Sequence, residues 1–345
     1  MKGRAAILVE QNKPLVIEEI EIPSLRFGQV LVKVDCSGIC GSQIGEISGV
    51  KGPDRFLPHL LGHEASARVL ECGEGVRTVR PGDHVVLHWR KGTGLEGPAP
   101  KYKSALGEIN AGWVTSFNDY AVISENRMTK VPESLDVEVT AMMGCAVTTG
   151  FGAINNNAQL KIGESVVILG AGGIGLNIVQ AAAMVGGHPI IAVDLHPSRL
   201  ELAAAIGATQ TVLAEAPEAL EQTLRSAVGS SGADVVIDNT GNARMIEMAY
   251  RLTSDKGRTI LVGVPKKGDC ASIYTLPLHF EKRITGSHGG ESIPEVDIPR
   301  YVRLHEAGKL PRSQIVGKRY SLEQINEAID DMRLGRVAGR CMIHF

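Results

Sequence analysis

The sequence predicts an α/β protein that combines an antiparallel, barrel-like unit with a doubly wound parallel sheet. Apolar residues alternate at a period of two in the N-terminal part, for example over 29–36 and 67–72, as in half-buried strands. Further along, short apolar runs alternate with helical patterns, which is typical of a parallel sheet with helices on both faces. A glycine-rich turn joins the first of these runs to the first of these helices.

We expect residues 1–146 to form the barrel-like unit. After the two alternating runs, a turn at 81–83 leads into a third apolar run at 84–87. The stretch from Arg90 to about 111 is polar and contains several Gly and Pro residues, which indicates a surface lobe.

We expect residues 147–288 to form the parallel sheet. One helical pattern follows the glycine turn, and a second helix begins near Ser198. The strand candidates are 165–170, 190–194, 210–213, 233–238, 258–263 and 282–286.

The last part of the chain, 289–345, is too short to fold alone and is expected to return to the barrel-like unit. It contains one predicted helix, from Leu322 to about Arg333, with Ser321 as its N-cap residue. A closing strand is expected over 340–345.

The composition is that of a globular cytoplasmic protein with no nucleic-acid or membrane partner. The 36 Lys and Arg residues nearly balance the 38 Asp and Glu residues, so the formal net charge of -2 provides no basic field for nucleic acid. No run reaches the roughly 18 apolar residues of a membrane-spanning helix, and the N-terminus has no signal-peptide pattern. Six scattered cysteines favour reduced thiols over disulfides.

The glycine turn predicts a dinucleotide site. Its glycines fit the G-x-G-x-x-G pattern, in which they permit a tight turn, backbone approach to a pyrophosphate and close packing of helix on strand. Asp194 ends the next strand at about the spacing of the carboxylate that binds the ribose hydroxyls, which favours NAD over NADP. Arg199 either lies near that ribose or is a solvated charge at a helix start. The expected cofactor residues here are Gly170, Gly172, Gly173, Ile174, Gly175, Asp194 and Arg199.

We expect Cys40, His63 and Cys145 to bind one catalytic zinc. Two thiolates and one imidazole leave the fourth position of a tetrahedral zinc open to water or substrate. Glu64, next to His63, is expected near the metal, where it would bind or retune it. Ser42 places a hydroxyl two residues after the first ligand.

Taken together, these motifs resemble the zinc-dependent medium-chain alcohol dehydrogenase family over nearly the whole chain. The segments that carry the resemblance are 40–42, 62–64, 81–85, 144–150, 170–175 and 261–265. The segment around Cys145 and the segment 284–290 are most similar to the branch with the classical and glutathione-dependent formaldehyde dehydrogenases. The resemblance implies a GroES-like catalytic domain over 1–146 and 289–345, a Rossmann domain over 147–288, and a cleft between them.

The resemblance also implies roles for single residues. Zinc would act as a Lewis acid on the alcohol oxygen, Ser42 would accept the alcohol proton and pass it towards the ribose, and hydride would move to the nicotinamide. Thr149 is expected beside the nicotinamide ring, with the carbonyls of Val262 and Val264 on its carboxamide. Arg340 is expected to reach the pyrophosphate, unless it is a solvated strand charge. Family members are homodimers or homotetramers.

Several positions depart from the family pattern. The lobe at 90–111 lacks the four cysteines of the family's structural zinc site, so one zinc per subunit is expected. Gln43 replaces the Asp that usually accepts from the zinc-bound histidine, so either the zinc is more electrophilic or another carboxylate serves. Gly45 stands where some members have a relay histidine, and Gly41 where some have an arginine on the pyrophosphate. The proton is therefore expected to leave through ribose and water.

The substrate is less well defined by the sequence. Trp89 matches the family position that walls the substrate pocket, or it is a core aromatic. Four basic residues in the lobe would favour an anionic or polyhydroxylated substrate if they faced the cleft, and are otherwise solvated: Arg90, Lys91, Lys101 and Lys103. The favoured function is an NAD-linked zinc dehydrogenase of a small alcohol or polyol. The alternatives are a thiol-adduct formaldehyde dehydrogenase and a non-catalytic nucleotide-binding protein.

Overall fold

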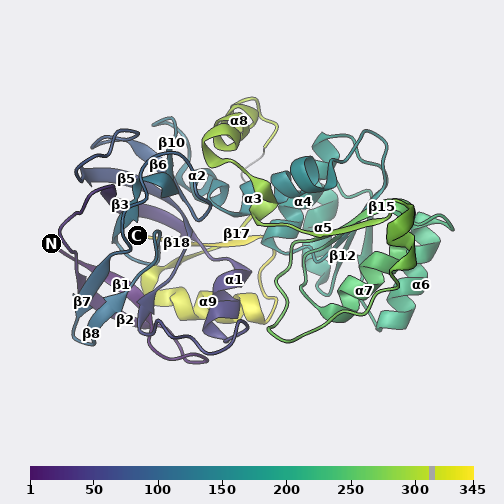
Figure 1. Ribbon diagram of the computed structural model, residues 1–345, viewed down its shortest axis with the longest axis horizontal. Helices are drawn as coiled ribbons and strands as arrows, with labels where there is room; N and C mark the ends of the chain where they lie inside the picture. The colour runs from purple at the N-terminus through teal and green to yellow at the C-terminus, as the bar shows by residue number, and fades with distance from the viewer. Residues whose placement is uncertain (311–314) are drawn as a thin grey trace. The chain divides into compact units, whose positions relative to one another are not determined.

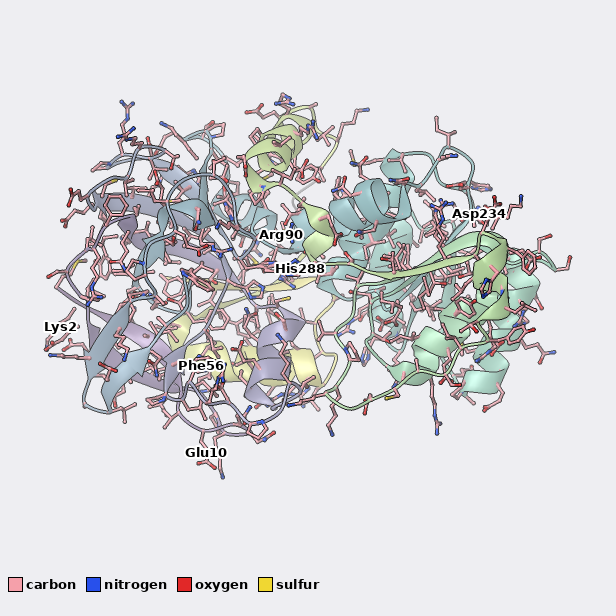
Figure 2. All side chains as sticks on the ribbon, in the orientation of Figure 1. Lys2, Glu10, Phe56, Arg90, Asp234 and His288 are labelled. Carbon is pink, nitrogen blue, oxygen red and sulfur yellow. The ribbon has the colours of Figure 1, made fainter. Side chains whose placement is uncertain are left out.

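The computed structural model describes residues 1–310 and 315–345, which divide into two compact units (Figure 1). Unit 1 comprises Met1–Thr148, Ile293–Arg336 and Arg340–Phe345, and unit 2 comprises Thr149–Ser292 with Val337–Gly339. Charged side chains such as Lys2 and Glu10 project from the surface of unit 1 (Figure 2). Barrel and parallel sheet are both present, so the predicted fold class is confirmed.

A closed five-stranded barrel forms one half of unit 1. Its strands, in order of pairing, are β1 (Lys2–Leu8), β2 (Val16–Glu21), β7 (Lys101–Ser104), β8 (Gly107–Asn110) and β4 (His59–Leu60). The hairpin of β7 and β8 lies within the segment expected to be a surface lobe, and that expectation is wrong for this part. Tyr102 and Ile109 are fully buried in the barrel core, because each strand alternates one apolar residue with polar neighbours.

The second half of unit 1 is a seven-stranded sheet. Its strands are β10 (Met128–Lys130), β6 (His84–His88), β5 (Glu64–Cys72), β3 (Gln29–Gly38), β18 (Arg340–His344) and β17 (Val316–Ser321), with β9 (Tyr120–Ser124) also pairing with β3. The three predicted runs lie in β3, β5 and β6. Their inward residues, mostly Val and Ala, form one core cluster.

The C-terminal part returns to unit 1. Strand β18 pairs antiparallel with β3, so the closing strand is confirmed. The predicted helix is present as a 3-10 turn, Leu322–Gln324, followed by α9 (Ile325–Arg333). Helix α8 (Pro294–Glu306) was not predicted, because Pro299 in its interior and a polar sequence conceal its helical pattern.

The remaining helices of unit 1 are short. They are α1 (Gly41–Ile47), α2 (Val137–Met143) and the 3-10 turn Glu125–Arg127, while α3 (Ala146–Gly152) crosses the boundary to unit 2. Among the described residues, no single helix is long and apolar enough to cross a membrane. One bent pair of helices, Val137–Met143 with Ala146–Ala158, passes that test only when taken together.

Unit 2 is a six-stranded parallel sheet with flanking helices (Figure 1). The strands, in spatial order, are β13 (Gln210–Leu213), β12 (Ile190–Asp194), β11 (Val166–Leu169), β14 (Ala233–Asp238), β15 (Thr253–Leu261) and β16 (Arg283–Gly286). The helices are α4 (Gly173–Met184), α5 (Pro197–Ala205), α6 (Pro217–Val228) and α7 (Ala243–Leu252), with shorter helical segments at Ala153–Ala158, Leu276–Phe280 and Gly289–Glu291. The spatial order reverses between β11 and β14, where a doubly wound sheet binds its ligand.

Candidate metal centre and nucleotide-binding turn

Cys40, His63 and Cys145 come from three separate segments of unit 1 and meet at one point. Their ligand atoms all lie within 4.8 Å of one another. Cys40 is the N-cap residue of α1, His63 directly precedes β5, and Cys145 lies between α2 and α3. Both cysteines are buried, at 3% and 4% exposure. The structure therefore brings together the three residues that the sequence singled out.

Two glycines allow these segments to approach so closely. Gly62, before His63, has a φ of +92°, and a Cβ there would lie 2.3 Å from Ser116 Oγ. Gly144, before Cys145, has an ordinary φ, but a Cβ would lie 2.1 Å from the carbonyl oxygen of Leu87 in β6. A larger residue at either position would push a candidate ligand out of place.

The donor set fits a zinc ion. Two Zn–S bonds of about 2.3 Å in a tetrahedron place the sulfurs about 3.8 Å apart, and the Sγ atoms of Cys40 and Cys145 are 4.0 Å apart. Two buried polar atoms at this place have no hydrogen-bond partner among the described residues: His63 Nε2 and Ser42 Oγ. A buried imidazole nitrogen without a partner is costly unless it binds something. Three donors leave the fourth tetrahedral position open.

The two thiols have opposite pKa shifts. The hydrogen bond from Cys145 lowers the pKa of Cys40 well below its usual range, and the positive charge of Arg340 acts in the same direction. Donating that hydrogen bond, together with burial, raises the pKa of Cys145. The pair therefore shares one proton between two sulfurs, and a metal that binds both thiolates releases that proton.

Glu64 and Arg340 form a buried ion pair beside the cysteines. Glu64 Oε1 accepts from Arg340 Nε at 2.6 Å, and Oε2 accepts from the backbone N–H of Ala146 at 3.1 Å. Burial raises the pKa of Glu64, whereas Arg340 opposes that rise. The ligand cluster found among the described residues does not include Glu64, and its expected binding or retuning of the metal stays a prediction. Arg340 Nε donates to Glu64, and the expected reach of this guanidinium to a pyrophosphate stays a prediction.

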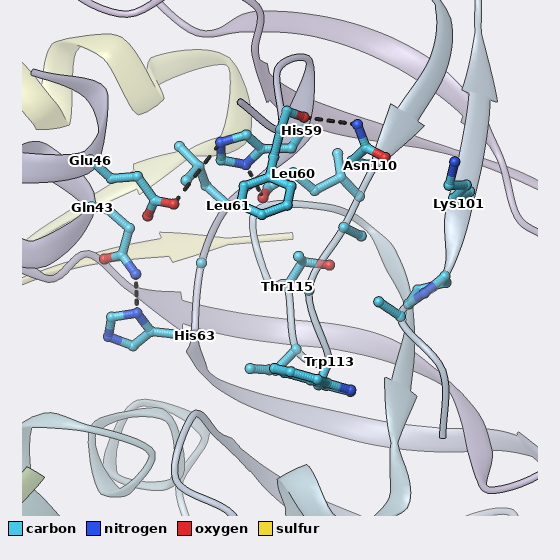
Figure 3. Close-up of a pocket in the computed structure, with 17 residues that line it drawn as sticks. Gln43, Glu46, His59, Leu60, Leu61, His63, Lys101, Asn110, Trp113 and Thr115 are labelled. Carbon is cyan, nitrogen blue, oxygen red and sulfur yellow. Dashed lines mark hydrogen bonds and ion pairs between the residues drawn. The ribbon is translucent and has the colours of Figure 1, made fainter. Parts of the chain in front are cut away.

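Gln43 lies between two of the candidate zinc ligands, Cys40 and His63, and contacts both. Its Oε1 accepts from the backbone N–H of Cys40 at 2.7 Å, and its Nε2 faces His63 Nδ1 (Figure 3). An aspartate would offer Nδ1 an acceptor, but this amide, once its oxygen is used by Cys40, offers Nδ1 a donor. The substitution noted in the sequence thus changes the hydrogen bond that sets the tautomer of His63.

A cavity of about 530 Å³ opens beside His63 within unit 1 (Figure 3). Its lining includes the aromatic side chains of Phe56 and Trp113. The ring centroid of Trp89 lies 6.4 Å from that of His63, and its role as a wall of the substrate pocket stays a prediction. The lining combines apolar and polar side chains: Gln43, Glu46, Phe56, His59, Leu60, Leu61, His63, Lys101, Asn110, Trp113, Val114 and Thr115.

Of the four basic residues expected to bear on substrate choice, only Lys101 lines this cavity in the described structure. Its ammonium pairs with Glu108 at 2.5 Å. Lys91 pairs with Glu96 at 3.4 Å, and the Arg90 guanidinium lies 5.9 Å from the Trp89 ring. Lys91 and Lys101 thus each have a carboxylate partner. Trp113, Glu46 and His59 were missed, because no motif links them to His63 in sequence.

In unit 2 the glycine turn has the geometry expected of a phosphate-binding turn. Gly170 has a φ of +96°, and a Cβ on Gly175 would lie 1.9 Å from the carbonyl oxygen of Gly170. A Cβ on Gly172 would meet nothing within 4 Å, so its outer side is open space. Gly172 is the N-cap residue of α4 and provides no side-chain hydrogen bond, which leaves Gly173, Ile174 and their N–H groups at an uncapped helix start.

Asp194 lies at the end of β12, next to this turn. Its Oδ2 accepts from the backbone N–H of Ala171 at 2.8 Å, and its Oδ1 accepts from that of His196 at 3.0 Å. Arg199 Nη1 is 3.5 Å from the same Oδ1. The predicted ribose residues are thus gathered at the carboxyl end of β12.

The other expected cofactor residues also lie in unit 2. Thr149 is in α3 and is 5% exposed. Val262 donates its N–H to the carbonyl of Asp238 at 2.7 Å, and Val264 is 58% exposed with its carbonyl next to Gly241. Sequence reasoning missed Asp238, whose fully buried carboxylate accepts from the N–H of Gly241 at 3.0 Å and holds the turn after β14. A strand-end Asp followed by Asn-Thr-Gly was the available signal.

Comparisons with known proteins agree with this arrangement. A zinc-binding dehydrogenase family model matches residues 173–306, and an alcohol dehydrogenase GroES-like domain model matches residues 26–133. The chain is 32% identical to an NDMA-dependent alcohol dehydrogenase of Amycolatopsis methanolica, over 100% of this chain and 99% of the relative. It is 30% identical to an S-(hydroxymethyl)glutathione dehydrogenase of Photobacterium damsela subsp. piscicida, over 100% of both chains.

Solved structures are similar over the whole length as well. A benzyl alcohol dehydrogenase from Acinetobacter calcoaceticus superposes with a TM-score of 0.88 at 27% identity, covering 100% of this chain and 99% of the other. A 2R,3R-butanediol dehydrogenase from Bacillus subtilis gives a TM-score of 0.80 at 26% identity, covering 99% of each chain.

Proposed function

Because the chain belongs to the zinc-dependent medium-chain alcohol dehydrogenase family, we propose that it catalyses the reversible, NAD-linked oxidation of an alcohol to a carbonyl compound. The observation that carries the proposal is the buried cluster of Cys40, His63 and Cys145 at the edge of a cavity. A protein that only bound nucleotides would have no need of three converging metal donors with one open position.

In this proposal Cys40, His63 and Cys145 hold the catalytic zinc. The ion supplies a Lewis acid that lowers the proton affinity of the alcohol oxygen. Ser42, whose buried Oγ has no partner among the described residues, would accept that proton and pass its own proton on towards solvent. Glu64 does not bind the metal directly, and with Arg340 it sets the charge behind the two sulfurs.

The nucleotide site of the proposal is built from unit 2. The pyrophosphate lies over Gly172 at the start of α4, where the open side of the glycine and the helix N-terminus both favour an anion. Asp194 accepts from the ribose hydroxyls and repels a 2'-phosphate, which favours NAD. Arg199 lies beside that carboxylate. Thr149 would contact the nicotinamide, and the carbonyls of Val262 and Val264 would accept from its carboxamide.

The cavity beside His63 supports a small alcohol or polyol as the substrate. Its apolar wall suits a carbon chain, and its polar residues can accept or donate to further hydroxyl groups. A thiol-adduct formaldehyde dehydrogenase is the second candidate, favoured by full-length relatives named S-(hydroxymethyl)glutathione dehydrogenase. We also propose a cytoplasmic homodimer or homotetramer, in keeping with the family and with six free cysteines.

The test combines metal content with activity. Purified protein is expected to contain zinc and to reduce NAD with a panel of alcohols, polyols and a formaldehyde–thiol adduct. Cys145→Ala should lose that zinc and all activity, while Cys72→Ala, a matched change outside the cluster, should keep both. Full activity in zinc-free protein would contradict the metal mechanism, and activity with the adduct alone would favour the second candidate.

A further inference from the structure

A second cluster of side chains with metal-ligand chemistry includes two residues that line the same cavity, Glu46 and His59. Glu46 from α1, Asp54 from the loop after it and His59 from β4 place their ligand atoms within 4.8 Å of one another. His59 Nε2 is 2.8 Å from Asp54 Oδ2 and 4.0 Å from Glu46 Oε1. Figure 3 shows the Glu46 carboxylate pointing towards the His59 ring.

The hydrogen bonds of His59 leave one nitrogen committed to this cluster. Its Nδ1 lies 2.9 Å from the carbonyl oxygen of Leu60, which accepts, so Nδ1 carries a hydrogen. In the neutral imidazole, Nε2 then has a lone pair directed at the carboxylates of Asp54 and Glu46. A lone pair and a carboxylate repel each other. Because His59 is only 7% exposed, water cannot screen this repulsion. A positive charge must therefore lie between them, either a proton or a metal cation.

We propose that Glu46, Asp54 and His59 form a second cation site that binds a divalent transition-metal ion. A histidine that gives Nδ1–H to a backbone carbonyl and keeps Nε2 for the metal has the usual arrangement of a metal-binding imidazole. The two carboxylates balance the charge of a divalent ion. Three protein ligands leave further coordination positions, and the adjoining cavity has room for the waters that would fill them.

The present distances need only small adjustments to accept such an ion. Bonds of about 2.0–2.1 Å in a tetrahedron place neighbouring ligand atoms about 3.3 Å apart. The Asp54 carboxylate would move slightly away from His59 Nε2, and the Glu46 carboxylate would move closer to it. Asp54 is already oriented, because its Oδ1 accepts from the N–H of Phe56 at 2.8 Å, whereas Glu46 is half exposed and free to turn. The adjustment therefore falls on the more mobile side chain.

The two candidate sites differ in the ions they should prefer. Cys40, His63 and Cys145 offer two soft thiolates, which favour zinc. Glu46, Asp54 and His59 offer only oxygen and nitrogen, which also suit manganese. This inference does not depend on the proposed dehydrogenase activity, and it replaces the expected single metal per chain by two sites of different chemistry.

Titration with Mn²⁺ of protein that carries one zinc per chain tests the inference. Electron paramagnetic resonance follows the loss of the free Mn²⁺ signal, and metal analysis counts zinc in the same sample. We expect one Mn²⁺ per chain in addition to the zinc. Glu46→Gln, His59→Gln and Asp54→Asn should weaken Mn²⁺ binding at least about tenfold. Glu10→Gln, an exposed carboxylate elsewhere on unit 1, should change nothing.

The controls separate this site from the zinc centre. Cys145→Ser should lose zinc but keep Mn²⁺ binding, whereas failure of the dehydrogenase proposal alone would leave the Mn²⁺ result unaffected. Because Glu46 is half exposed on α1, its variant should fold even if the His59 variant does not. The inference is overturned if the protein binds no metal beyond the zinc, or if Glu46→Gln binds Mn²⁺ as tightly as the wild type.

Discussion

The metal centre of unit 1 and the nucleotide turn of unit 2 are built in opposite ways. The turn uses six consecutive residues, mostly glycines, and its functional groups are backbone N–H groups at the start of α4. The metal centre uses side chains as far apart in sequence as Cys40 and Cys145, held by packing against β5 and β6. A site made from consecutive residues tolerates changes elsewhere in its unit. A site made from distant residues depends on tertiary contacts that no short sequence motif predicts.

The largest effect is expected at the ion pair behind the metal centre. Arg340→Met would leave Glu64, which is fully buried, without its guanidinium partner, so the free energy of unfolding should fall by about 3–5 kcal/mol. Denaturant unfolding of zinc-loaded protein measures this change. Lys2→Met, which breaks an exposed pair with Glu19, is the control and should leave the free energy of unfolding almost unchanged. A similar small cost for Arg340→Met would mean that the pair does not support the centre.

Acid should destabilise unit 1 through His88, the residue that pairs with Glu64 across β5 and β6. Burial lowers the pKa of His88 to about 4. The unfolded chain, with an ordinary pKa of about 6.5, therefore takes up the proton first. The contribution of neutral His88 to the free energy of unfolding is fully present above about pH 6.5 and is lost as the pH falls towards 4. Below about pH 4 this contribution no longer changes. The total loss is about 3 kcal/mol.

Denaturant unfolding between pH 7 and pH 4 measures this loss. His88→Gln should show a flatter pH dependence over that window, while His279→Gln, an exposed histidine in unit 2, should follow the wild type. Equal slopes in all three proteins would contradict the assigned role of His88.

The contrast between local and assembled features also explains what the sequence could predict. The central strands of unit 2, β11, β12 and β14, were predictable because each is a short apolar run buried on both faces. The glycine turn was predictable because its spacing is itself the signal. The three metal donors were identified as residue types, but their meeting point required the fold. The hairpin β7–β8 was missed because two apolar residues, Tyr102 and Ile109, carry its whole burial pattern.

Partners across the fold were not predictable. Arg340 lies on Glu64, 276 residues away in the chain, and no local pattern encodes that choice. Trp113 lines the cavity although no motif marks it, because its place there depends on the fold around it. The carboxylate partners of His59 could not be predicted either, because they come from a helix and a loop that only the fold brings together.

A smaller effect, confined to cofactor binding, is expected in the nucleotide turn. Gly172→Ala would add a methyl group where no protein atom lies within 4 Å, so stability should change by less than about 0.5 kcal/mol. If the pyrophosphate lies on that open side, the Kd for NAD should rise at least about tenfold. Calorimetric titration of NAD measures this, with Gly286→Ala, equally unobstructed in unit 2, as the control. An unchanged Kd would place the pyrophosphate elsewhere.

The mildest change should act in the opposite direction, at the hydrogen bond between Gln43 and His63. Gln43→Glu keeps the shape of the side chain, and its two carboxylate oxygens can accept from the N–H of Cys40 and from His63 Nδ1–H together. That removes the donor facing Nδ1 and fixes the tautomer in which Nε2 binds the metal, so zinc affinity should rise about tenfold. Competition with a chelator measures the affinity. Unchanged or weaker binding would mean that the neutral amide already turns its oxygen to His63, and that the N–H of Cys40 is satisfied in another way.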